Sequence, residues 1–248
     1  MDKYGLIGYP LGHSFSKQFF TEKFAREGID AVYENYEIAD AKDLLEVVRK
    51  EPNLRGLNCT IPHKQAILPL LDDLSDAARE IGAVNVIQIR KGETEKPILK
   101  GFNSDYIGFT ESIKPLLLQK HHKALVFGTG GASHAIRYAL IKLGIEWQCV
   151  SRSRHDDVLC YEDLTPDVIH DHKVIVNCSP LGMFPRTDDA PKFPYEALTR
   201  DHLLYDLIYN PLQTRFLQLG AEHGATTKNG LEMLHLQAEA SWKIWNEP

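Results

Sequence analysis

The chain is poor in cysteine: Cys59, Cys149, Cys160 and Cys178 are the only ones among 248 residues, and no two of them form a C-x-x-C pair. Three of them lie in or beside apolar runs, where a free cysteine behaves as a small buried hydrophobic residue. Neither a disulfide framework nor a cysteine-rich zinc module is therefore expected, and a reducing, cytoplasmic location is favoured. The N-terminus runs directly into a strand-like segment without a signal-peptide layout, which favours the same location.

The chain also carries no excess of positive charge. It has 28 lysine and arginine residues and 34 aspartate and glutamate residues, so the net charge is −6. We therefore expect no nucleic-acid partner, because such binding depends on positive charge. No apolar stretch approaches the roughly 20 residues that cross a bilayer, so no membrane partner is expected either. The composition, 43% hydrophobic, is that of a globular protein with one large or two smaller domains.

One glycine-rich stretch is the most informative part of the sequence. Residues 124–133 read A-L-V-F-G-T-G-G-A-S, and apolar residues then recur at helical spacing as far as Leu143. This pattern predicts a buried strand, a tight turn and the start of a helix. The unpaired N–H groups of such a helix start can bind the pyrophosphate of a dinucleotide. The alternative is a turn that binds no ligand, because the full fingerprint has a third glycine where Ser133 stands.

The segment after the next predicted strand bears on the choice of cofactor. Residues 147–150 read as that strand, at the distance that a βαβ unit requires, and Ser151-Arg152-Ser153-Arg154 follow it. An acidic residue at this point would hold the ribose 2′-hydroxyl of NAD, whereas two guanidinium groups suit a 2′-phosphate. The sequence therefore predicts NADP rather than NAD. The alternative is a solvated pair of arginines, whose field Asp156 and Asp157 would weaken.

Strand-like and helix-like segments alternate along the whole chain. Because a βαβαβ order implies a mostly parallel sheet covered by helices, an α/β fold is predicted. A polar segment interrupts the alternation of strands and helices, so we place a domain boundary between residues 103 and 123. Strands are expected at 3–7, 32–38, 54–60, 83–87, 98–102, 124–127, 147–150, 174–177 and 203–208, helices at 19–28, 41–49, 64–71, 75–82, 105–117, 132–143, 214–221 and 231–245, and a turn at 227–230.

Lys64 and Asp105 each follow a strand of the predicted first domain. Ligands of open parallel sheets bind beyond the carboxyl ends of the strands, so both side chains are candidates for one crevice. A lysine beside a carboxylate can hold a substrate hydroxyl and shuttle its proton. The alternative is a salt bridge combined with a helix cap.

Neutral polar residues near predicted element ends suggest what such a crevice would bind. A set of hydroxyl and amide groups suits a small polyhydroxylated substrate, because buried hydroxyls need matched partners. Taken singly, each of these residues is more typical of a cap or a turn. No metal site is expected, since the eleven histidines show no zinc-type spacing, and no G-x-S-x-G motif indicates a serine nucleophile. The candidate substrate residues are Ser14, Ser16, Thr60, Asn85 and Gln237.

Several separate motifs resemble those of the shikimate dehydrogenases, and together they cover nearly the whole chain. The combination is far more specific than the glycine turn alone. The matching segments are the opening strand with its S-x-S element at 8–16, N-x-T-x-P-x-K at 58–64, two short signatures at 82–85 and 101–105, the G-x-G-G-A loop at 128–132, the NADP-phosphate clamp at 151–154, and two C-terminal elements at 205–211 and 230–237.

The resemblance implies reversible, NADPH-dependent reduction of 3-dehydroshikimate to shikimate, a step of chorismate and aromatic amino-acid biosynthesis, by a monomer or homodimer. It implies an N-terminal α/β substrate domain with a mostly parallel sheet at 1–104, a Rossmann-like NADP-binding domain at 105–230, and a last helix at 231–248 that returns to the first domain. Carried over to matching positions, the catalytic pair is Lys64 and Asp105; the substrate residues are Ser14 and Ser16, which hold the carboxylate, with Thr60, Asn85, Tyr209 and Gln237; and the cofactor residues are Gly128, Thr129, Gly130, Gly131, Ala132, Ser151, Arg152, Arg154, Leu207 and Gly230.

The chain departs from the family pattern at three places. Lys17 stands where a proline often follows S-x-S, Ser151 replaces the usual asparagine of the clamp, and Cys178-Ser179-Pro180 replaces an alanine-threonine-serine run. None of these changes touches the proposed acid/base pair.

Three alternative functions would each require a different residue at a particular position. A quinate/shikimate dehydrogenase that uses NAD would have an acidic residue in place of Arg152 and Arg154. A tetrahydrofolate dehydrogenase of related layout would have a tyrosine where Thr60 stands. A non-catalytic NADP-binding regulator would have a broken acid/base pair, whereas Lys64 and Asp105 are both present.

Overall fold

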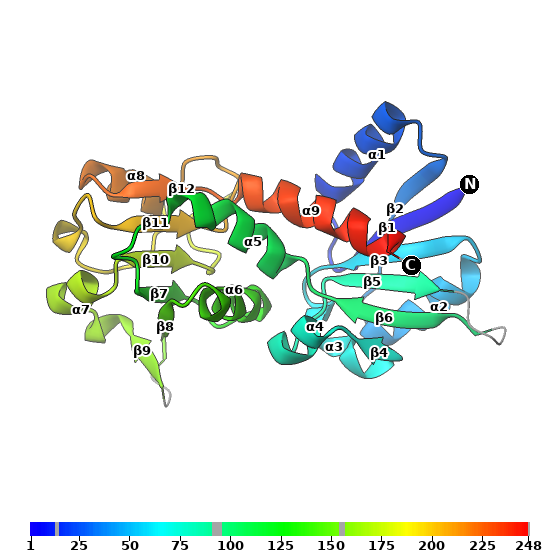
Figure 1. Ribbon diagram of the computed structural model, residues 1–248, viewed down its shortest axis with the longest axis horizontal. Helices are drawn as coiled ribbons and strands as arrows, with labels where there is room; N and C mark the ends of the chain where they lie inside the picture. The colour runs from blue at the N-terminus through cyan, green and yellow to red at the C-terminus, as the bar shows by residue number, and fades with distance from the viewer. Residues whose placement is uncertain (13–14, 91–95, 154–156, 248) are drawn as a thin grey trace. The chain divides into compact units, whose positions relative to one another are not determined.

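The chain folds into two compact units, each with its own sheet and core (Figure 1). The structure is a computed structural model that describes residues 1–12, 15–90, 96–153 and 157–247. The first unit consists of Met1–Ser104 and Gln237–Pro248, and the second of Asp105–Leu236. Both sheets are mostly parallel, and the last helix contributes to the first unit, so the predicted fold class is confirmed.

The first unit is built on a six-stranded sheet with the order β2-β1-β3-β5-β6-β4. Strand β5 runs antiparallel to its neighbours β3 and β6, and the other pairings are parallel. The elements of this unit in chain order are β1 (Asp2–Gly8), α1 (Phe15–Glu27), β2 (Ala31–Glu37), α2 (Leu44–Lys50), β3 (Leu54–Cys59), α3 (His63–Ala66), β4 (Asp73–Leu74), α4 (Asp76–Ile81), β5 (Val86–Arg90) and β6 (Ile98–Phe102), followed at the end of the chain by most of α9 (Leu231–Asn246).

Each face of this sheet has its own apolar core. On one face, Leu44 of α2 and Ile67, just after α3, pack against Leu57 and neighbouring strand residues. On the other face, Phe20 of α1 and Trp245 of α9 belong to a largely aromatic cluster. The sheet is therefore covered on both sides, which is the usual arrangement for parallel strands.

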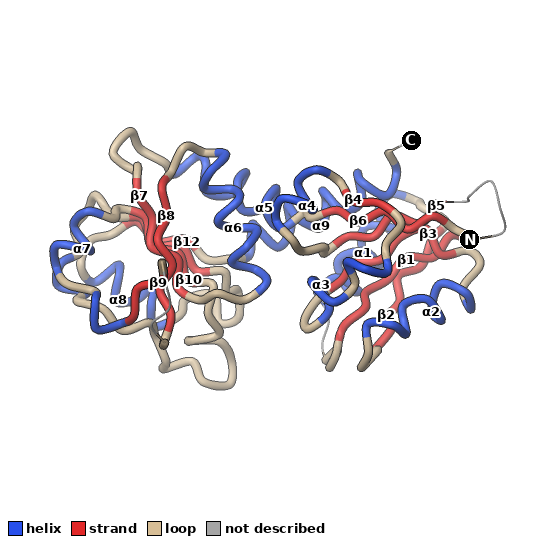
Figure 2. The backbone as a smooth tube through the Cα atoms, turned by 90° about the horizontal axis from the view of Figure 1, so that it is seen from below, coloured by secondary structure: helices blue, strands red, loops and turns tan. Residues whose placement is uncertain are grey.

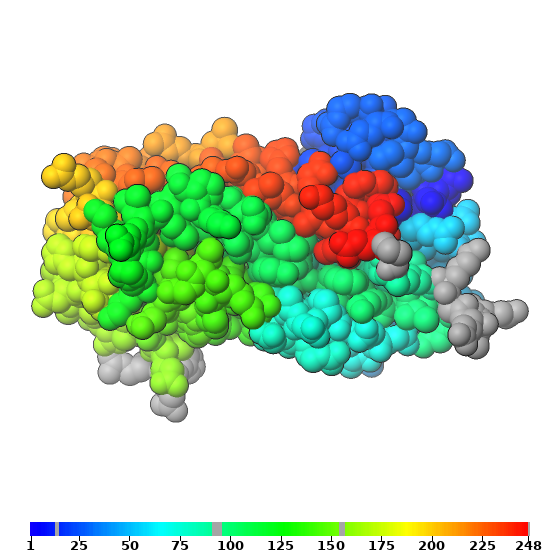
Figure 3. Space-filling model, viewed as in Figure 1, coloured from blue at the N-terminus to red at the C-terminus, as the bar shows by residue number. Residues whose placement is uncertain are grey.

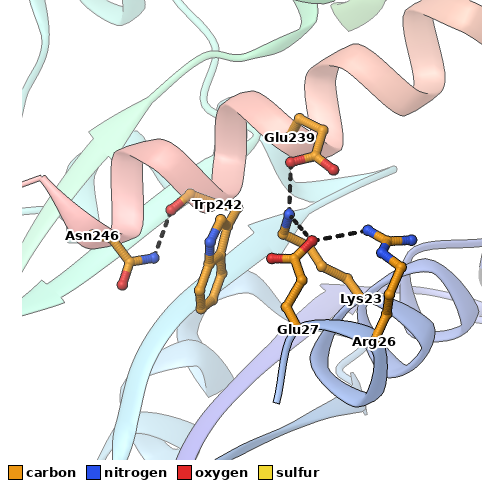
Figure 4. A network of polar contacts seen from close by, with 6 residues as sticks. All are labelled: Lys23, Arg26, Glu27, Glu239, Trp242 and Asn246. Atoms are coloured by element: carbon orange, nitrogen blue, oxygen red, sulfur yellow. Dashed lines mark hydrogen bonds and ion pairs between the residues drawn. The ribbon is translucent and has the colours of Figure 1, made fainter. Parts of the chain in front are cut away.

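Helices α1 and α9 are joined by a buried lysine on that second face. The Lys23 side chain is 7% exposed, and its ammonium lies 3.0 Å from Glu27 and 2.9 Å from Glu239 (Figure 4). A buried charge is costly unless it is paired, so these carboxylates tie the two helices together. Figure 3 shows that both helices reach the surface of this unit, α1 in blue and the end of α9 in red.

The second unit has six parallel strands in the order β12-β11-β10-β7-β8-β9. Figure 2 shows α5 and α6 on one side of this sheet and α7 and α8 on the other. The elements are α5 (Asp105–Ile113), β7 (Lys123–Phe127), α6 (Gly131–Lys142), β8 (Glu146–Ser151), β9 (Val158–Cys160), α7 (Pro166–Asp171), β10 (Val174–Asn177), β11 (Leu203–Asp206), α8 (Arg215–Glu222), β12 (Thr226–Lys228) and the first residues of α9.

Two details of this unit differ from the sequence-based expectation. Thr227 and Lys228, expected in a turn, belong to strand β12, because they pair in parallel with β11. The boundary between the units also falls inside helix α9 rather than at its start. Met233 packs into the core beneath α5 and α6, so residues 231–236 belong to the second unit.

Candidate active site

The strand order of the first unit reverses between β1 and β3, and three predicted site residues follow these two strands. Strand β2 flanks β1 on one side and β3 flanks it on the other. Ligands of open α/β sheets bind where the order reverses, outside the carboxyl ends of the strands. Ser16 lies in the first turn of α1, after β1, while Thr60 and Lys64 follow β3. Ser14, the other predicted carboxylate ligand, lies outside the described residues.

The backbone around Lys64 is held at both ends. The N–H of Thr60 donates to the carbonyl of Ile7 at 2.9 Å, and the N–H of Val84 donates to the carbonyl of Lys64 at 2.8 Å. Next to Lys64, the ring of His63 is 2% exposed and its Nε2 lies 2.7 Å from the carbonyl of Ile38. Lys64 itself is partly exposed. The sequence therefore places a partly exposed lysine on a short helix whose backbone is held at both ends.

Asn85 is held in one orientation by Ser104. Its Oδ1 accepts from the Ser104 N–H at 2.6 Å, and its Nδ2 donates to the Ser104 hydroxyl at 3.0 Å. Both residues are buried, at 3% and 0% exposure. The direction of the Asn85 amide is thus fixed. Ser104 thus uses both its backbone N–H and its hydroxyl to hold Asn85.

Gln237 joins the same polar cluster from helix α9. The Ser104 hydroxyl lies 3.3 Å from Gln237 Oε1 and 3.1 Å from the hydroxyl of Ser241. Ser241 also accepts from Nδ2 of Asn58, whose Oδ1 accepts from the Tyr33 hydroxyl at 2.8 Å. Sequence reasoning missed Tyr33 and Ser241. The available signal was that Ser241 follows Gln237 by four residues, which places both on one face of a helix.

Asp105 is the first residue of helix α5 and of the second unit, and it is 8% exposed. The peptide bond joins it directly to Ser104, which belongs to the buried polar cluster of the first unit. Lys64 and Asp105 thus belong to different units. Their action as a pair stays a prediction.

In the second unit the strand order reverses between β7 and β10, and the glycine turn follows β7. Gly128 has φ +98°, a conformation that favours glycine, and its N–H donates to the Val150 carbonyl at 2.9 Å. A side chain there would come within 3.2 Å of the Cys178 backbone, which follows β10. At the position of the missing third glycine, the Ser133 hydroxyl turns inward and donates to the Gly130 carbonyl at 2.7 Å.

The N-terminus of α6 has room for an anion. Gly130 caps this helix without a side-chain bond, and a Cβ added there would meet no atom within 4 Å. Thr129 and Gly130 are exposed, and Gly131 and Ala132 are partly so. Free N–H groups and the positive end of the helix dipole favour negative charge at such a place. These residues therefore fit the pyrophosphate of a dinucleotide.

The predicted 2′-phosphate clamp is only partly described, because Arg154 lies outside the described residues. Ser151 uses its hydroxyl locally: the oxygen accepts from the Ser153 N–H at 3.2 Å and its proton goes to the Ser153 carbonyl at 2.6 Å. Arg152, at the tip of this turn, is exposed. Burial raises the pKa of the nearby Tyr161, and the charge of Arg152 lowers it in part. Ser151 thus shapes the turn that presents the Arg152 guanidinium.

Leu207 and Gly230 touch each other through the backbone. The Leu207 N–H donates to the Asn177 carbonyl at 3.0 Å, and the Gly230 N–H donates to the Ile208 carbonyl at 3.0 Å. A Cβ on Gly230 would lie 2.0 Å from the Leu207 carbonyl oxygen, so only glycine fits. Tyr209, two residues beyond Leu207, is 38% exposed.

Asp206, a residue that sequence reasoning did not select, anchors this loop. It is fully buried, and its carboxylate accepts from Asn177 Nδ2, the Ile208 N–H and the Thr214 hydroxyl at 3.1, 3.1 and 2.6 Å. Burial raises the pKa of Asp206 to about 6, although the three hydrogen bonds oppose the shift. The predicted strand at 203–208 ends at Asp206 because the carboxylate captures the N–H of Ile208.

Within residues 1–12, 15–90, 96–153 and 157–247, no group of three or more His, Cys, Asp or Glu side chains lies in a position to hold a metal ion. Within the same part of the chain, no helix is both long enough and apolar enough to cross a membrane.

Comparison with known proteins gives one consistent family. The family described as "Shikimate dehydrogenase substrate binding domain" matches residues 6–87. The shikimate dehydrogenase (NADP(+)) of Methanosphaera stadtmanae is 33% identical, over 97% of this chain and 90% of that protein. The crystal structure of shikimate 5-dehydrogenase from Thermus thermophilus, in complex with NADP(H) and shikimate, is similar with a TM-score of 0.85 and 30% identity, over 99% of this chain and 94% of that one. Quinate dehydrogenase from Corynebacterium glutamicum, in complex with NAD, has a TM-score of 0.86 at 28% identity, over 99% and 93%.

Proposed function

The chain belongs to the shikimate dehydrogenase family, and we propose that it catalyses the reversible, NADPH-dependent reduction of 3-dehydroshikimate to shikimate. The observation that carries this proposal is the family match over 97% of the chain. The polar residues and the glycine turn that follow the strands at the two strand-order reversals support it. The first unit, 1–104 with the end of the last helix, acts as the substrate domain. The second unit, which begins at Asp105, acts as the cofactor domain.

The substrate residues supply donors of the type that each part of the substrate needs. Ser14 and Ser16 bind the carboxylate, which only accepts hydrogen bonds. Asn85 meets a ring hydroxyl in the orientation that Ser104 imposes on its amide. Thr60, Gln237 and Tyr209 complete the substrate contacts. A site that hydrogen-bonds hydroxyls rejects an analogue without them, because its own polar groups are then left unpaired.

NADP binds to the second unit through the residues that fit its parts. Thr129, Gly130, Gly131 and Ala132 present backbone N–H groups to the pyrophosphate, and Gly128 forms the tight turn that leads into them. Ser151 shapes the turn from which Arg152 reaches the 2′-phosphate, and Arg154 is the second proposed ligand of that phosphate. Leu207 and Gly230 adjoin the nicotinamide. When bound, this cofactor supplies or accepts the hydride.

Lys64 and Asp105 move the proton. Reduction of a ketone places negative charge on its oxygen, and the Lys64 ammonium donates a proton to that oxygen as the charge forms. The Asp105 carboxylate accepts a hydrogen bond from the substrate hydroxyl and orients the ammonium. In the oxidation direction Lys64, in its neutral form, takes the proton back.

NAD-dependent oxidation of quinate is the second candidate, since a quinate dehydrogenase in complex with NAD is among the similar structures. Arg152 opposes it, because the guanidinium suits a 2′-phosphate that NAD does not carry. The four cysteines are free thiols, which is consistent with a cytoplasmic enzyme. We propose a monomer or homodimer.

The acid/base proposal is tested with Lys64→Ala, Asp105→Asn and the double variant. Positioned acid/base groups contribute about 10²–10⁴-fold in rate, so each single variant should lower kcat by that order. Because the two residues act as one unit, the double variant should lose much less than the product of the single losses. Lys50→Ala is the matched control, since Lys50 is an exposed lysine of the same unit, paired with Glu46 at 2.7 Å.

NADPH binding, followed by fluorescence, separates catalysis from damage to the cofactor domain. The wild type and all four variants should bind NADPH alike. A Lys64→Ala enzyme with the kcat of the wild type would contradict the acid/base role, and fully multiplicative losses would show that Lys64 and Asp105 act separately.

A further inference from the structure

Strand β2 carries an asparagine whose side chain has no structural partner. The oxygen Oδ1 of Asn35 is buried and has no hydrogen-bond partner among the described residues. The residue as a whole is partly exposed, and its amide nitrogen has no hydrogen bond within the same part of the chain either. Since Oδ1 is the buried end of the amide, the nitrogen is its accessible end. A buried acceptor without a donor lowers stability, so the packing of the sheet does not account for an asparagine here.

Asn35 points to the side of the sheet that α1 covers. Successive strand residues point to opposite faces, so Asn35 shares the face of Tyr33, two residues earlier. Tyr33 belongs to the aromatic cluster on that face, and its ring stacks on that of Phe20 in α1 with centroids 4.8 Å apart. Tyr36, the next residue along β2, packs instead against the core on the opposite face.

The first turn of α1 lies at the same level of the sheet as Asn35. Strands β1 and β2 are parallel, so α1, which connects them, runs antiparallel to β2. From the stacked rings of Phe20 and Tyr33, Ser16 lies four residues back along α1, about 6 Å. Asn35 lies two residues on along β2, about 6.6 Å in the same direction. Ser16 also shares the helix face of Phe20, because positions four apart lie above one another.

Two polar contacts at this end of β2 agree with that placement. The Lys17 ammonium lies 2.6 Å from the carboxylate of Glu34, the residue before Asn35. The N–H of Leu11 donates to the carboxylate of Glu37, two residues after Asn35, at 3.1 Å. Both Leu11 and the start of α1 are therefore held against the end of β2 that carries Asn35.

We propose that Asn35 is a further substrate-binding residue, whose amide nitrogen donates a hydrogen bond to the carboxylate that Ser16 binds. This inference rests on the proposed function, in that Ser16 binds a substrate carboxylate. An ionised carboxylate has about four acceptor positions, so two serine hydroxyls leave room for another donor. The amide N–H supplies that donor without adding charge, and hydrogen bonds to an ionised acceptor are stronger than those between neutral groups.

Shikimate binding, measured by calorimetry, tests this role without depending on turnover. Asn35→Ala should raise the Kd for shikimate about tenfold, the effect of one hydrogen bond to a charged group. The methyl ester of shikimate, which is neutral, should lose much less. Asn35→Asp keeps the shape of the side chain but places a negative acceptor beside the carboxylate. It should therefore raise the Kd for shikimate more than Asn35→Ala does, and the Kd for the ester far less.

Tyr36→Phe is the matched control, because the Tyr36 hydroxyl is likewise buried without a partner among the described residues but belongs to the opposite face. It should leave the Kd for shikimate unchanged. An unchanged Kd in Asn35→Ala, or an equal loss for the acid and the ester, would overturn the inference and leave the proposed function standing. Absence of any shikimate binding by wild type would overturn both.

The side-chain amide of Asn35 also gives a direct readout in the wild-type protein. Its N–H signals in a proton–nitrogen NMR spectrum are identified by their loss in Asn35→Asp. Addition of shikimate should move one of them downfield, as a hydrogen bond to a carboxylate does, and the methyl ester should move it less. Signals that stay in place would overturn the inference. Failure of both Asn35→Ala and Asn35→Asp to fold would also overturn it, since that would show a structural role.

Discussion

Replacement of Asp206 by asparagine should change how the stability of the protein depends on pH. The Asp206 carboxyl is fully buried at the end of β11, and burial raises its pKa from 3.8 to about 6. In the unfolded chain the ordinary value returns. Between these two pH values the folded protein binds more protons than the unfolded chain, so the stability falls as the pH rises from about 4 to about 6. Above about pH 6 the stability lost through ionisation of Asp206 no longer changes.

The size of the effect follows from the shift. A difference of roughly 2 pKa units, at about 1.4 kcal/mol each, gives about 3 kcal/mol between pH 4 and pH 7. Asp206→Asn cannot ionise, yet its oxygen can still accept from Asn177 and Ile208, and its amide can donate to the Thr214 hydroxyl. The variant should therefore gain about 3 kcal/mol relative to wild type over this pH range.

Urea unfolding of both proteins at several pH values between 4 and 7 measures this difference. Asp201→Asn is the control: Asp201 is an exposed carboxylate whose pKa is lowered by its hydrogen bond to Lys120, so its removal should not reproduce the gain. Parallel stability curves for wild type and Asp206→Asn would refute the reasoning, since they would show that Asp206 ionises in the folded protein as easily as in the unfolded chain.

Two further predictions concern the cofactor and the core of the first unit. Arg152→Ala should raise the KM for NADP about ten- to a hundredfold and hardly change the use of NAD, because a charge-assisted contact to the 2′-phosphate is lost; equal losses for both cofactors, or the same loss in the exposed control Arg200→Ala, would argue against it. Gly56→Ala should lower the free energy of unfolding by about 1–3 kcal/mol, because overpacking strains a core, and its Cβ would lie 2.3 Å from the Trp245 ring. Denaturant midpoints should show that Gly56→Ala lowers the free energy of unfolding much less in a Trp245→Leu background. Gly12→Ala should not lower it, because a Cβ there has open space. A full loss of stability in the Trp245→Leu background would contradict the explanation.

The sequence predicts the elements best where apolar runs end at strong breakers. The strand at 174–177 is found at those residues, because a proline and a glycine follow shortly after it. Strand β12 could not be predicted, since its residues Thr226–Lys228 are polar or β-branched and only the pairing with β11 makes them a strand. The three-residue β9 and the six-residue α7 were too short to give a periodic pattern.

In the candidate site, residues of short motifs could be placed from the sequence, whereas contacts between residues far apart in the sequence could not. Lys64 and Gly128 lie in motifs that are complete within a few residues. The sequence alone therefore placed Lys64 after β3 and Gly128 after β7. The contact of Asn58 with Ser241 joins residues 183 positions apart, and no local pattern indicates it. Asp206 looked like one polar residue in an apolar strand. Its burial, which raises the pKa, and its hydrogen bonds with Thr214 and Asn177 arise only in the folded chain.

The central claim, that this chain oxidises shikimate with NADP, is tested most directly by mixing the purified protein with shikimate and NADP and following NADPH by its absorbance. We expect NADPH to form at a rate proportional to enzyme, far faster with NADP than with NAD and with shikimate than with quinate, and to be lost in Lys64→Ala. No NADPH at any pH, in a protein that still binds NADPH, would contradict the claim and favour a non-catalytic role.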